Sequence, residues 1–409
     1  MIFGAGVVLT LLFFSLYFEV FLLVSFLERR FTRTKPASLD TSKLPRVAII
    51  VPCLNEENAL AASLKSLLAL DYPSDKLSVI VVDDGSTDST MSIAESFASD
   101  PRISVLRKEN GGKHSAMNHG LAHTDAELIG CLDADSVVAS DALMKIAPIF
   151  ADERVAAVTP GIHVKTPETL LQHMQHVEYR LSLFNRFILA ALGAVFITPG
   201  PFSIFRTSVI RELGGWRYAH STEDMEMALR IQEAGHMIGN APNAVVHTAT
   251  PRNLRGLFRQ RVRWTYGWLR NAVDYKHMFG NIRYGNLGII ILPFAIISIF
   301  TGIYFFARIT YYLGVAAYKK YLEIHYAGFH FSPGAPDLFY FNTSAVWMLV
   351  WVSVALIIAL ISIGSLIGTG SRRPPASTPL FVIFYSFLVP LWLGVALVRA
   401  IFKTGVRWR

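Results

Sequence analysis

Four long apolar runs limit the folds open to this chain more than any other feature. They cover residues 2–27, 286–307, 344–369 and 379–398, and Glu19 is the one charged residue among them. Each run approaches the ~20 residues that a helix needs to cross the ~30 Å of hydrocarbon in a bilayer. The composition agrees, because 52% of the residues are hydrophobic and only 17% are charged. We therefore expect an N-terminal transmembrane helix in residues 1–30 and a C-terminal transmembrane bundle of about three spans in residues 285–409.

The charges beside these runs predict the orientation of an integral cell membrane protein. The segment ERRFTRTK at 28–35 follows the first run directly, and an excess of basic residues marks the cytoplasmic side. The first run lacks the basic front and cleavage site of a secretory signal peptide, so we expect a retained anchor. The polar region that follows should lie in the cytoplasm. The span count stays open, because the C-terminal KTGVRWR is basic too and residues 308–343 could form an interfacial helix or part of another crossing.

The polar region at 36–250 has the pattern of an α/β domain. Apolar runs that end in polar, acidic clusters occupy 46–56, 77–86 and 126–136, and helix-like stretches occupy 57–70 and 86–99. We predict a mostly parallel, Rossmann-like sheet, because buried strands apolar on both faces alternate with helices. Ligands bind such sheets at the carboxyl ends of the strands. Carboxylates gathered there repel one another unless a cation or a ligand's hydrogen-bond donors offset the repulsion.

Two of these strand ends carry paired aspartates. DADS contains Asp133 and Asp135, which can hold a hard divalent cation together with diphosphate oxygens. The same residues could instead cap a turn. VVDDGSTD contains Asp83 and Asp84, where a carboxylate could accept a hydrogen bond from the imide N–H of uracil. A turn followed by a helix cap explains these residues equally well.

The stretch NGGKHSAMNHG predicts a bend followed by a basic side chain. Lys113 follows two glycines, so it can meet a phosphate group by its charge, together with the N–H groups of the bend. In isolation, a loop tip with a solvated lysine accounts for the same residues.

The stretch HSTEDMEMALR holds three carboxylates within four positions, among them Glu223 and Asp224. It reads as an acidic helix start in which Ser221 or Thr222 is the cap. It also reads as a catalytic group held in place by that helix start.

The stretch RQRVRWTYGW places Gln260, Arg263, Trp264 and Gly267 on one helical face. The guanidinium fork suits a diphosphate, and an indole ring can stack on a sugar. An amphipathic helix on the membrane surface has the same composition, and both interpretations can hold together. We expect an interfacial helix within 251–280.

A second interfacial helix is expected near 169–196, which is amphipathic in its first half and apolar in its second. His173, His176 and Glu178 lie on it, and we interpret them as a mixed polar face rather than a metal site.

The motifs together resemble a known family. The order DDGSTD, GGK, DADS, STED and QRVRW, between an N-terminal span and a C-terminal bundle, resembles the membrane-embedded family 2 glycosyltransferases. More narrowly, it is similar to the processive polysaccharide synthases that make cellulose, chitin, hyaluronan and poly-N-acetylglucosamine. The resemblance covers roughly residues 1–310. It implies a GT-A-like glycosyltransferase domain, a hexosyl- or N-acetylhexosaminyltransferase activity, a UDP-sugar donor and Mg²⁺ or Mn²⁺.

The resemblance also implies roles for residues on the donor side. Asp84, with Asp83 beside it, matches the aspartate that contacts the uridine. Lys113 matches the lysine near the donor diphosphate, and Asp133 and Asp135 match the pair that holds the metal and the diphosphate.

On the acceptor side, Asp224 matches the general base, and Glu223 is expected to shape the substrate site. Gln260, Arg263 and Trp264 match the helix that holds the donor diphosphate and the acceptor end. The stretch TPGPFSIFR at 198–206 matches the lining of the acceptor channel.

The implied reaction is an inverting, metal-dependent transfer to the end of a growing β-linked polysaccharide at the cytoplasmic face, with extrusion of the chain. The alternatives are a single transfer to a membrane lipid such as ceramide or diacylglycerol, and a non-catalytic protein that binds nucleotide sugars. The bilayer and a glycan or lipid acceptor are the expected partners, and nucleic acid is not. The small bundle leaves open whether a second copy or an accessory membrane subunit completes an export channel.

Overall fold

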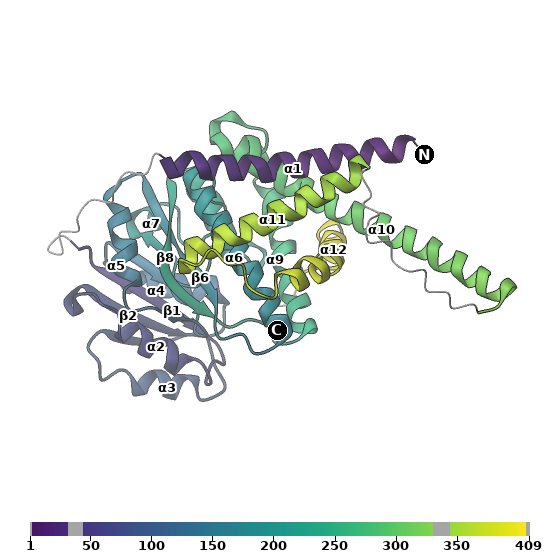
Figure 1. Ribbon diagram of the computed structural model, residues 1–409. Coiled ribbons are helices and arrows are strands. Elements are labelled where there is room, and N and C mark those ends of the chain that lie inside the picture. Colours follow the sequence, from purple (N-terminus) through teal and green to yellow (C-terminus); the bar gives the residue numbers. More distant parts are fainter. Residues whose placement is uncertain (1, 32–43, 330–343, 406–409) are drawn as a thin grey trace.

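The computed structural model describes residues 2–31, 44–329 and 344–405 (Figure 1). The basic segment at 28–35, from which we predicted the orientation, lies partly outside these residues. So do the C-terminal segment at 403–409 and the segment at 308–343, which left the span count open.

Within the described residues, eight strands form one mixed sheet. Their order is β3 (Ile103–Arg107), β2 (Leu77–Asp83), β1 (Val47–Cys53), β4 (Leu128–Cys131), β7 (Ile204–Arg206), β6 (Val155–Val164), β8 (Met237–Thr248) and β5 (Val137–Val138). The three predicted strands are β1, β2 and β4, and β1 pairs in parallel with both others. Parallel pairing continues from β3 to β4 and recurs between β6 and β8, as predicted, and the antiparallel β7 between β4 and β6 makes the sheet mixed.

Helices cover both faces of this sheet. One core cluster joins the strands to α2 (Leu60–Leu68), α3 (Thr90–Ser96) and α5 (Ala142–Ile146). The other joins them to α4 (Lys113–Ala122), α7 (Thr207–Glu212) and α8 (Glu223–Glu233). Cys53 at the end of β1 is in register with Asp83 at the end of β2, so the polar segments after these strands start at the same edge.

In the part of the chain that the structure describes, four helices are long and apolar enough to cross a membrane, as the apolar runs predicted. They are α1 (Ile2–Phe31), α10 (Leu292–Ala327), α11 (Ala345–Thr369) and α12 (Thr378–Phe402). A π-helical segment at Leu287–Ile291 joins α10 to make one element of 41 residues. At 1.5 Å per residue this element is about 60 Å long, roughly twice the hydrocarbon thickness. Residues 308–327 therefore continue α10 instead of forming a separate helix, and Figure 1 shows this end projecting away from the other helices.

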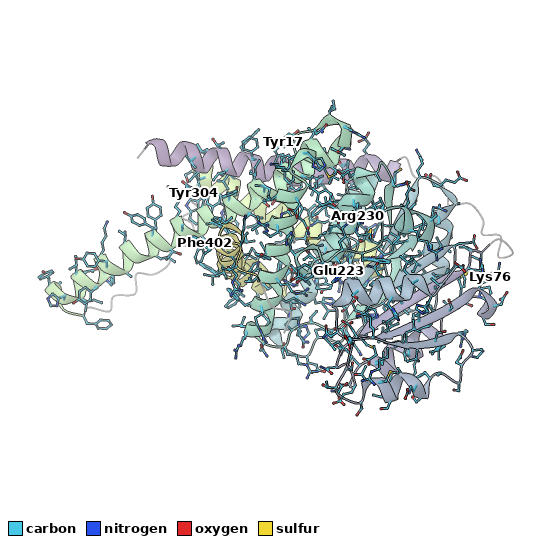
Figure 2. All side chains as sticks on the ribbon, turned by 180° about the vertical axis from the view of Figure 1, so that it is seen from behind. Tyr17, Lys76, Glu223, Arg230, Tyr304 and Phe402 are labelled. Carbon is cyan, nitrogen blue, oxygen red and sulfur yellow. The ribbon has the colours of Figure 1, made fainter. Side chains whose placement is uncertain are left out.

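Two amphipathic helices join the sheet to the apolar helices: α6 (Leu170–Ala191) and α9 (Leu254–Asp274). A capping box at Thr169 starts α6, and Asn253 caps α9 by accepting a hydrogen bond from the Gly256 N–H. α6 packs against α11, where a Cβ atom at Gly364 would overlap the Arg180 carbonyl. α9 packs against α12 (Figure 1). This arrangement puts the boundary between the sheet and the apolar helices next to α8, where Figure 2 shows Glu223.

Candidate active site

Asp84 holds the glycine bend in place. Its carboxylate accepts hydrogen bonds from the backbone N–H groups of Gly111 (3.0 Å) and Gly112 (2.8 Å) and from the Lys108 ammonium (2.7 Å). Gly112 has a φ of +84°, which suits glycine. The Asp84 carboxylate thus accepts from the two N–H groups that the sequence offered to a phosphate, and the ammonium of Lys113 is the part of that interpretation that remains available.

Asp83 is fully buried at the end of β2. Its Oδ1 accepts a hydrogen bond from the Ser86 N–H (3.1 Å), while its buried Oδ2 receives none from a described residue. The nearest cation to Oδ2 is the Arg107 guanidinium, at 3.6 Å. A buried acceptor of this kind is stabilised by a donor from a ligand.

Lys113 joins the sheet edge to α8. It is the first residue of α4, and its ammonium lies 2.5 Å from Asp133 Oδ1 and 3.6 Å from Glu223 Oε1. Burial lowers the pKa of Lys113, but the carboxylates of Asp133 and Glu223 outweigh it and hold this pKa well above its usual value. Gly200 leaves the space for this contact, because a Cβ atom there would overlap the ammonium and lie 2.7 Å from Asp133 Oδ2.

Asp133 and Asp135 follow β4, as the sequence predicted. Burial, with added repulsion from Asp133 and Glu56, raises the pKa of Asp135 to about 6. A cation between the two carboxylates would relieve this repulsion, so the pair fits a divalent metal. The described residues contain no cluster of three or more His, Cys, Asp or Glu side chains placed to hold a metal. The diphosphate of a bound nucleotide would therefore have to complete the coordination.

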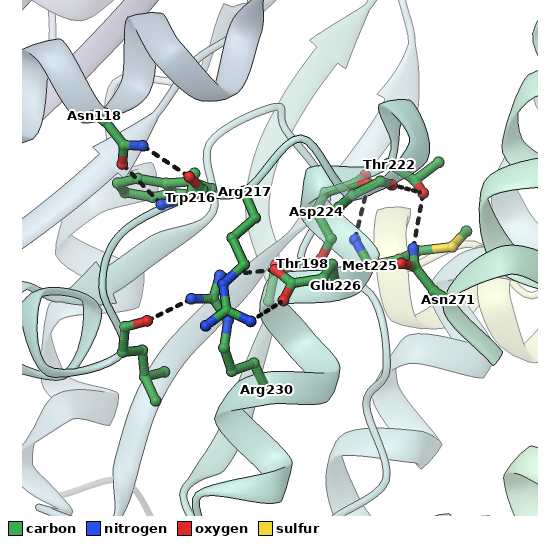
Figure 3. Close-up of polar contacts among 12 residues, drawn as sticks. Asn118, Thr198, Trp216, Arg217, Thr222, Asp224, Met225, Glu226, Arg230 and Asn271 are labelled. Carbon is green, nitrogen blue, oxygen red and sulfur yellow. Dashed lines mark hydrogen bonds and ion pairs between the residues drawn. The ribbon is translucent and has the colours of Figure 1, made fainter. Parts of the chain in front are cut away.

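Asp224 is the second residue of α8 and is half-buried, between the buried Glu223 and Glu226. Burial and the neighbouring Glu223 raise its pKa to about 6, although Lys113 and Arg263 act in the opposite direction. Its backbone carbonyl accepts hydrogen bonds from the N–H (3.1 Å) and the hydroxyl (2.8 Å) of Thr198 (Figure 3). The first turn of α8 is thus tied to the segment that precedes β7.

The predicted helix cap is absent from α8. Thr222 occupies the N-cap position but makes no capping hydrogen bond. Its hydroxyl instead donates to the Ala219 carbonyl (3.0 Å) and accepts from the Asn271 amide (3.0 Å). The sequence prediction failed here because a contact with α9 takes the hydroxyl.

Gln260, Arg263 and Trp264 lie on α9, as predicted. Arg263 donates to the Ser221 carbonyl (3.1 Å), next to α8. Gln260 accepts a hydrogen bond from Arg261 (2.9 Å), whose guanidinium lies 4.3 Å from the centre of the Trp264 ring. We did not predict a role for Arg261 from the sequence, although it lies directly between Gln260 and Arg263 of the motif.

Arg261 is a buried cation with a defined partner. Its guanidinium pairs with Glu178 of α6 at 2.6 Å, and the Tyr385 hydroxyl of α12 donates to the same carboxylate at 3.2 Å. Glu178 therefore connects three helices, which agrees with a polar face on α6 rather than a metal site.

A small cavity brings part of the predicted site together. It is lined by Lys113, Met117, Cys131, Thr198, Pro199, Gly200, Phe205, Trp216, Glu223 and Asp224. Three predicted residues, Lys113, Glu223 and Asp224, meet there with the start of TPGPFSIFR. The remaining predicted residues lie outside its lining: Asp83, Asp84, Asp133, Asp135, Gln260, Arg263 and Trp264.

Trp216 in this lining was not predicted. Asn118 fixes it through two hydrogen bonds, one to its carbonyl (2.7 Å) and one from its N–H (2.8 Å). Gly215, with a φ of +74°, allows Asn118 to approach. The glycine pair before Trp216 was the available signal.

The fold and the site define a class of enzyme. The profile described as "Glycosyltransferase like family 2" matches residues 45–267, and the chain belongs to this family. It is therefore a glycosyltransferase, and the predicted family and enzyme class are confirmed.

Individual relatives narrow the similarity. A poly-beta-1,6-N-acetyl-D-glucosamine synthase of Staphylococcus epidermidis is 27% identical over 335 residues, which cover 79% of this chain and 80% of the relative. The synthase of the same name from Staphylococcus aureus (strain MSSA476) is 29% identical over 300 residues, which cover 71% of this chain and 72% of the relative.

A solved structure shares the fold. The mannosyltransferase PcManGT from Pyrobaculum calidifontis, in complex with GDP-Man and Mn²⁺, superimposes with a TM-score of 0.63 and 22% identity. The match covers 98% of this chain and 99% of that one, so it includes the apolar helices. The predicted combination of a GT-A-like sheet with long apolar helices is confirmed.

Proposed function

We propose that this enzyme transfers N-acetylglucosamine from UDP-N-acetylglucosamine to the end of a growing β-linked polysaccharide. The observation that carries the proposal is the half-buried Asp224 carboxylate, which lines the same cavity as Lys113. The similarity to two poly-N-acetylglucosamine synthases, over more than two thirds of this chain, supports the choice of sugar and polymer.

Asp224 acts as the general base of an inverting transfer. It takes the proton of the acceptor hydroxyl while the acceptor oxygen forms a bond to the anomeric carbon. The bond from that carbon to the diphosphate breaks, and UDP leaves with the electron pair. A pKa of about 6 suits this role, because the group is ionised at neutral pH yet remains basic enough to accept a proton.

Positive charge stabilises the leaving UDP. Lys113 and Arg263, which both lie near the start of α8, supply it through an ammonium and a guanidinium fork. A divalent cation bound by Asp133 and Asp135 would add Lewis-acid stabilisation of the diphosphate. Asp83 and Asp84 recognise the uracil end, and the orphaned Oδ2 of Asp83 supports this assignment.

The acceptor end lies under α9. Trp264 stacks on the terminal sugar, Gln260 contacts it, and Glu223 shapes the floor of the site. We assign residues 36–250 to a cytoplasmic glycosyltransferase domain, 251–280 to an interfacial helix and 285–409 to a bundle that guides the product across the membrane. The basic segment at 28–35 supports this orientation.

The test is to assay purified enzyme in lipid nanodiscs with UDP-N-acetylglucosamine, UDP-glucose and GDP-mannose in parallel. We expect release of UDP from UDP-N-acetylglucosamine and a ladder of products spaced by one N-acetylhexosamine in mass spectra. A single sugar on a co-purified lipid would replace this proposal with a lipid glycosyltransferase. Turnover of GDP-mannose alone would overturn the assigned donor.

A further inference from the structure

The turn that leads into α8 has an unusual backbone. Ala219, His220 and Ser221 have φ values of +44°, +54° and +65°, a region that residues with a Cβ atom rarely adopt. Residues 219–222, which we call the lead-in turn, end two residues before Asp224. Backbone of this kind persists only where the surroundings hold it.

One face of α9 holds this turn. Arg263 donates to the Ser221 carbonyl (3.1 Å), Asn271 donates to the Thr222 hydroxyl (3.0 Å), and Asp274 pairs with His220 (2.8 Å). The α9 positions 263, 271 and 274 are 8 and 3 residues apart, which places them on one side of the helix. The helix that carries the QRVRW motif therefore also holds the turn that precedes Asp224.

Gly267 lies between these contacts on the same side. A Cβ atom at this position would overlap the hydroxyl and methyl groups of Thr222. The backbone of α9 thus touches the lead-in turn directly, without an intervening side chain.

Thr198 holds the first turn of α8 from a different segment, through its two hydrogen bonds to the Asp224 carbonyl (Figure 3). No side chain caps α8, so its first turn is held by Thr198, by the lead-in turn and by Glu226, which accepts a hydrogen bond from the Tyr275 hydroxyl (2.7 Å). A cavity of about 400 Å³ lies beside this turn, with Ala219, His220 and Asn271 in its lining. The lead-in turn therefore has space to move if its contacts with α9 are lost.

We propose that Asn271 is a positioning residue, which acts through Thr222 to fix the direction in which Asp224 meets the acceptor hydroxyl. This inference rests on the proposed role of Asp224 as base. Asn271 is not in the lining of the cavity that holds Asp224. Of the three α9 contacts, that of Arg263 belongs to a residue already assigned to the diphosphate. Of the other two, the buried amide of Asn271 makes the stronger contact, because the His220 and Asp274 side chains are 27% and 48% exposed.

The test compares Asn271→Ala with Asp274→Asn and with Val273→Ala, a control on the exposed side of α9. Loss of one hydrogen bond with a small misplacement of the base should lower kcat about 10-fold in Asn271→Ala, with an unchanged donor KM. Asp274→Asn should cost about twofold or less, and Val273→Ala should have no effect. The pH midpoint of kcat should fall from about 6 in Asn271→Ala, because a displaced Asp224 is less buried.

A second pair of variants tests the same contact if Asn271→Ala folds poorly. Thr222→Val removes the hydroxyl at nearly constant volume, and Thr222→Ser keeps it. Thr222→Val should reproduce the loss in kcat and the shifted midpoint, while Thr222→Ser should stay close to wild type. The double variant Asn271→Ala/Thr222→Val should be no worse than either single one, since both remove one shared contact.

Unchanged kcat and pH midpoint in Asn271→Ala or Thr222→Val would overturn the inference, even if Asp224→Asn abolishes transfer. Normal turnover in Asp224→Asn would instead overturn the proposed function, so the two failures are distinct.

Discussion

Gly200→Ala is a sharp test of the donor side, because one methyl group disturbs one contact. The added Cβ would overlap the Lys113 ammonium and lie 2.7 and 2.8 Å from the two carboxylate oxygens of Asp133. Lys113 has to leave this place, since it is the flexible partner. A hydrogen bond to a charged group is worth about 1.5–3 kcal/mol, and Lys113 and Asp133 are still 15% and 31% exposed. We therefore take the lower end and expect kcat/KM for the donor to fall about 10- to 30-fold.

The assay is initial-rate UDP release over a range of donor concentrations, combined with a thermal unfolding curve. Stability should hardly change, because Gly200 lies in a loop and does not have a positive φ. Gly394→Ala in α12 is the matched control, since a Cβ atom at that position would meet no other atom within 4 Å. A Gly200→Ala enzyme with wild-type kcat/KM would refute the reasoning that the Lys113–Asp133 contact serves donor binding.

Three further predictions concern pH, metal and stability. Burial and Glu223 raise the pKa of Asp224 to about 6, so the base is protonated below this pH. We therefore expect kcat to rise with pH through about 6, and a flat profile from pH 5 to 7 (roughly one unit to either side) would contradict this. Chelation with EDTA should stop transfer, and addition of Mn²⁺ or Mg²⁺ should restore it. The Asp135→Ala variant should need a higher metal concentration for half-maximal activity, and full activity of the wild type in EDTA would contradict the metal role. Glu178→Gln leaves Arg261, which is only 4% exposed, without its counter-charge. We expect the variant to be less stable by about 3 kcal/mol, with a lower melting temperature in detergent, and an unchanged melting temperature would contradict a stabilising role of this pair.

Features that depend on local pattern could be predicted from the sequence. The strands β1, β2 and β4 were predictable because each is an apolar run that ends in polar residues. The four long apolar helices followed from length and hydropathy alone. The extent of α10 could not be predicted in this way, because the apolar run ends at Arg308 while the helix continues to Ala327.

Features that depend on tertiary contacts could not be predicted in this way. β7 has three residues, too few to show a periodic pattern, so its antiparallel pairing was invisible. Thr222 has the right chemistry for a helix cap, but Asn271, 49 residues later, takes its hydroxyl. The Gly111 and Gly112 N–H groups suited phosphate by composition, yet Asp84 accepts from both.

The most direct test of the central claim is transfer by Asp224→Asn under conditions in which donor binding is measured separately. The amide keeps the shape of the side chain but cannot accept the acceptor proton. We predict wild-type affinity for the donor and a loss of transfer of about 10²- to 10⁴-fold, while Glu233→Gln, on the same helix but outside the Asp224 cavity, remains active. Near-normal transfer by Asp224→Asn would contradict the account.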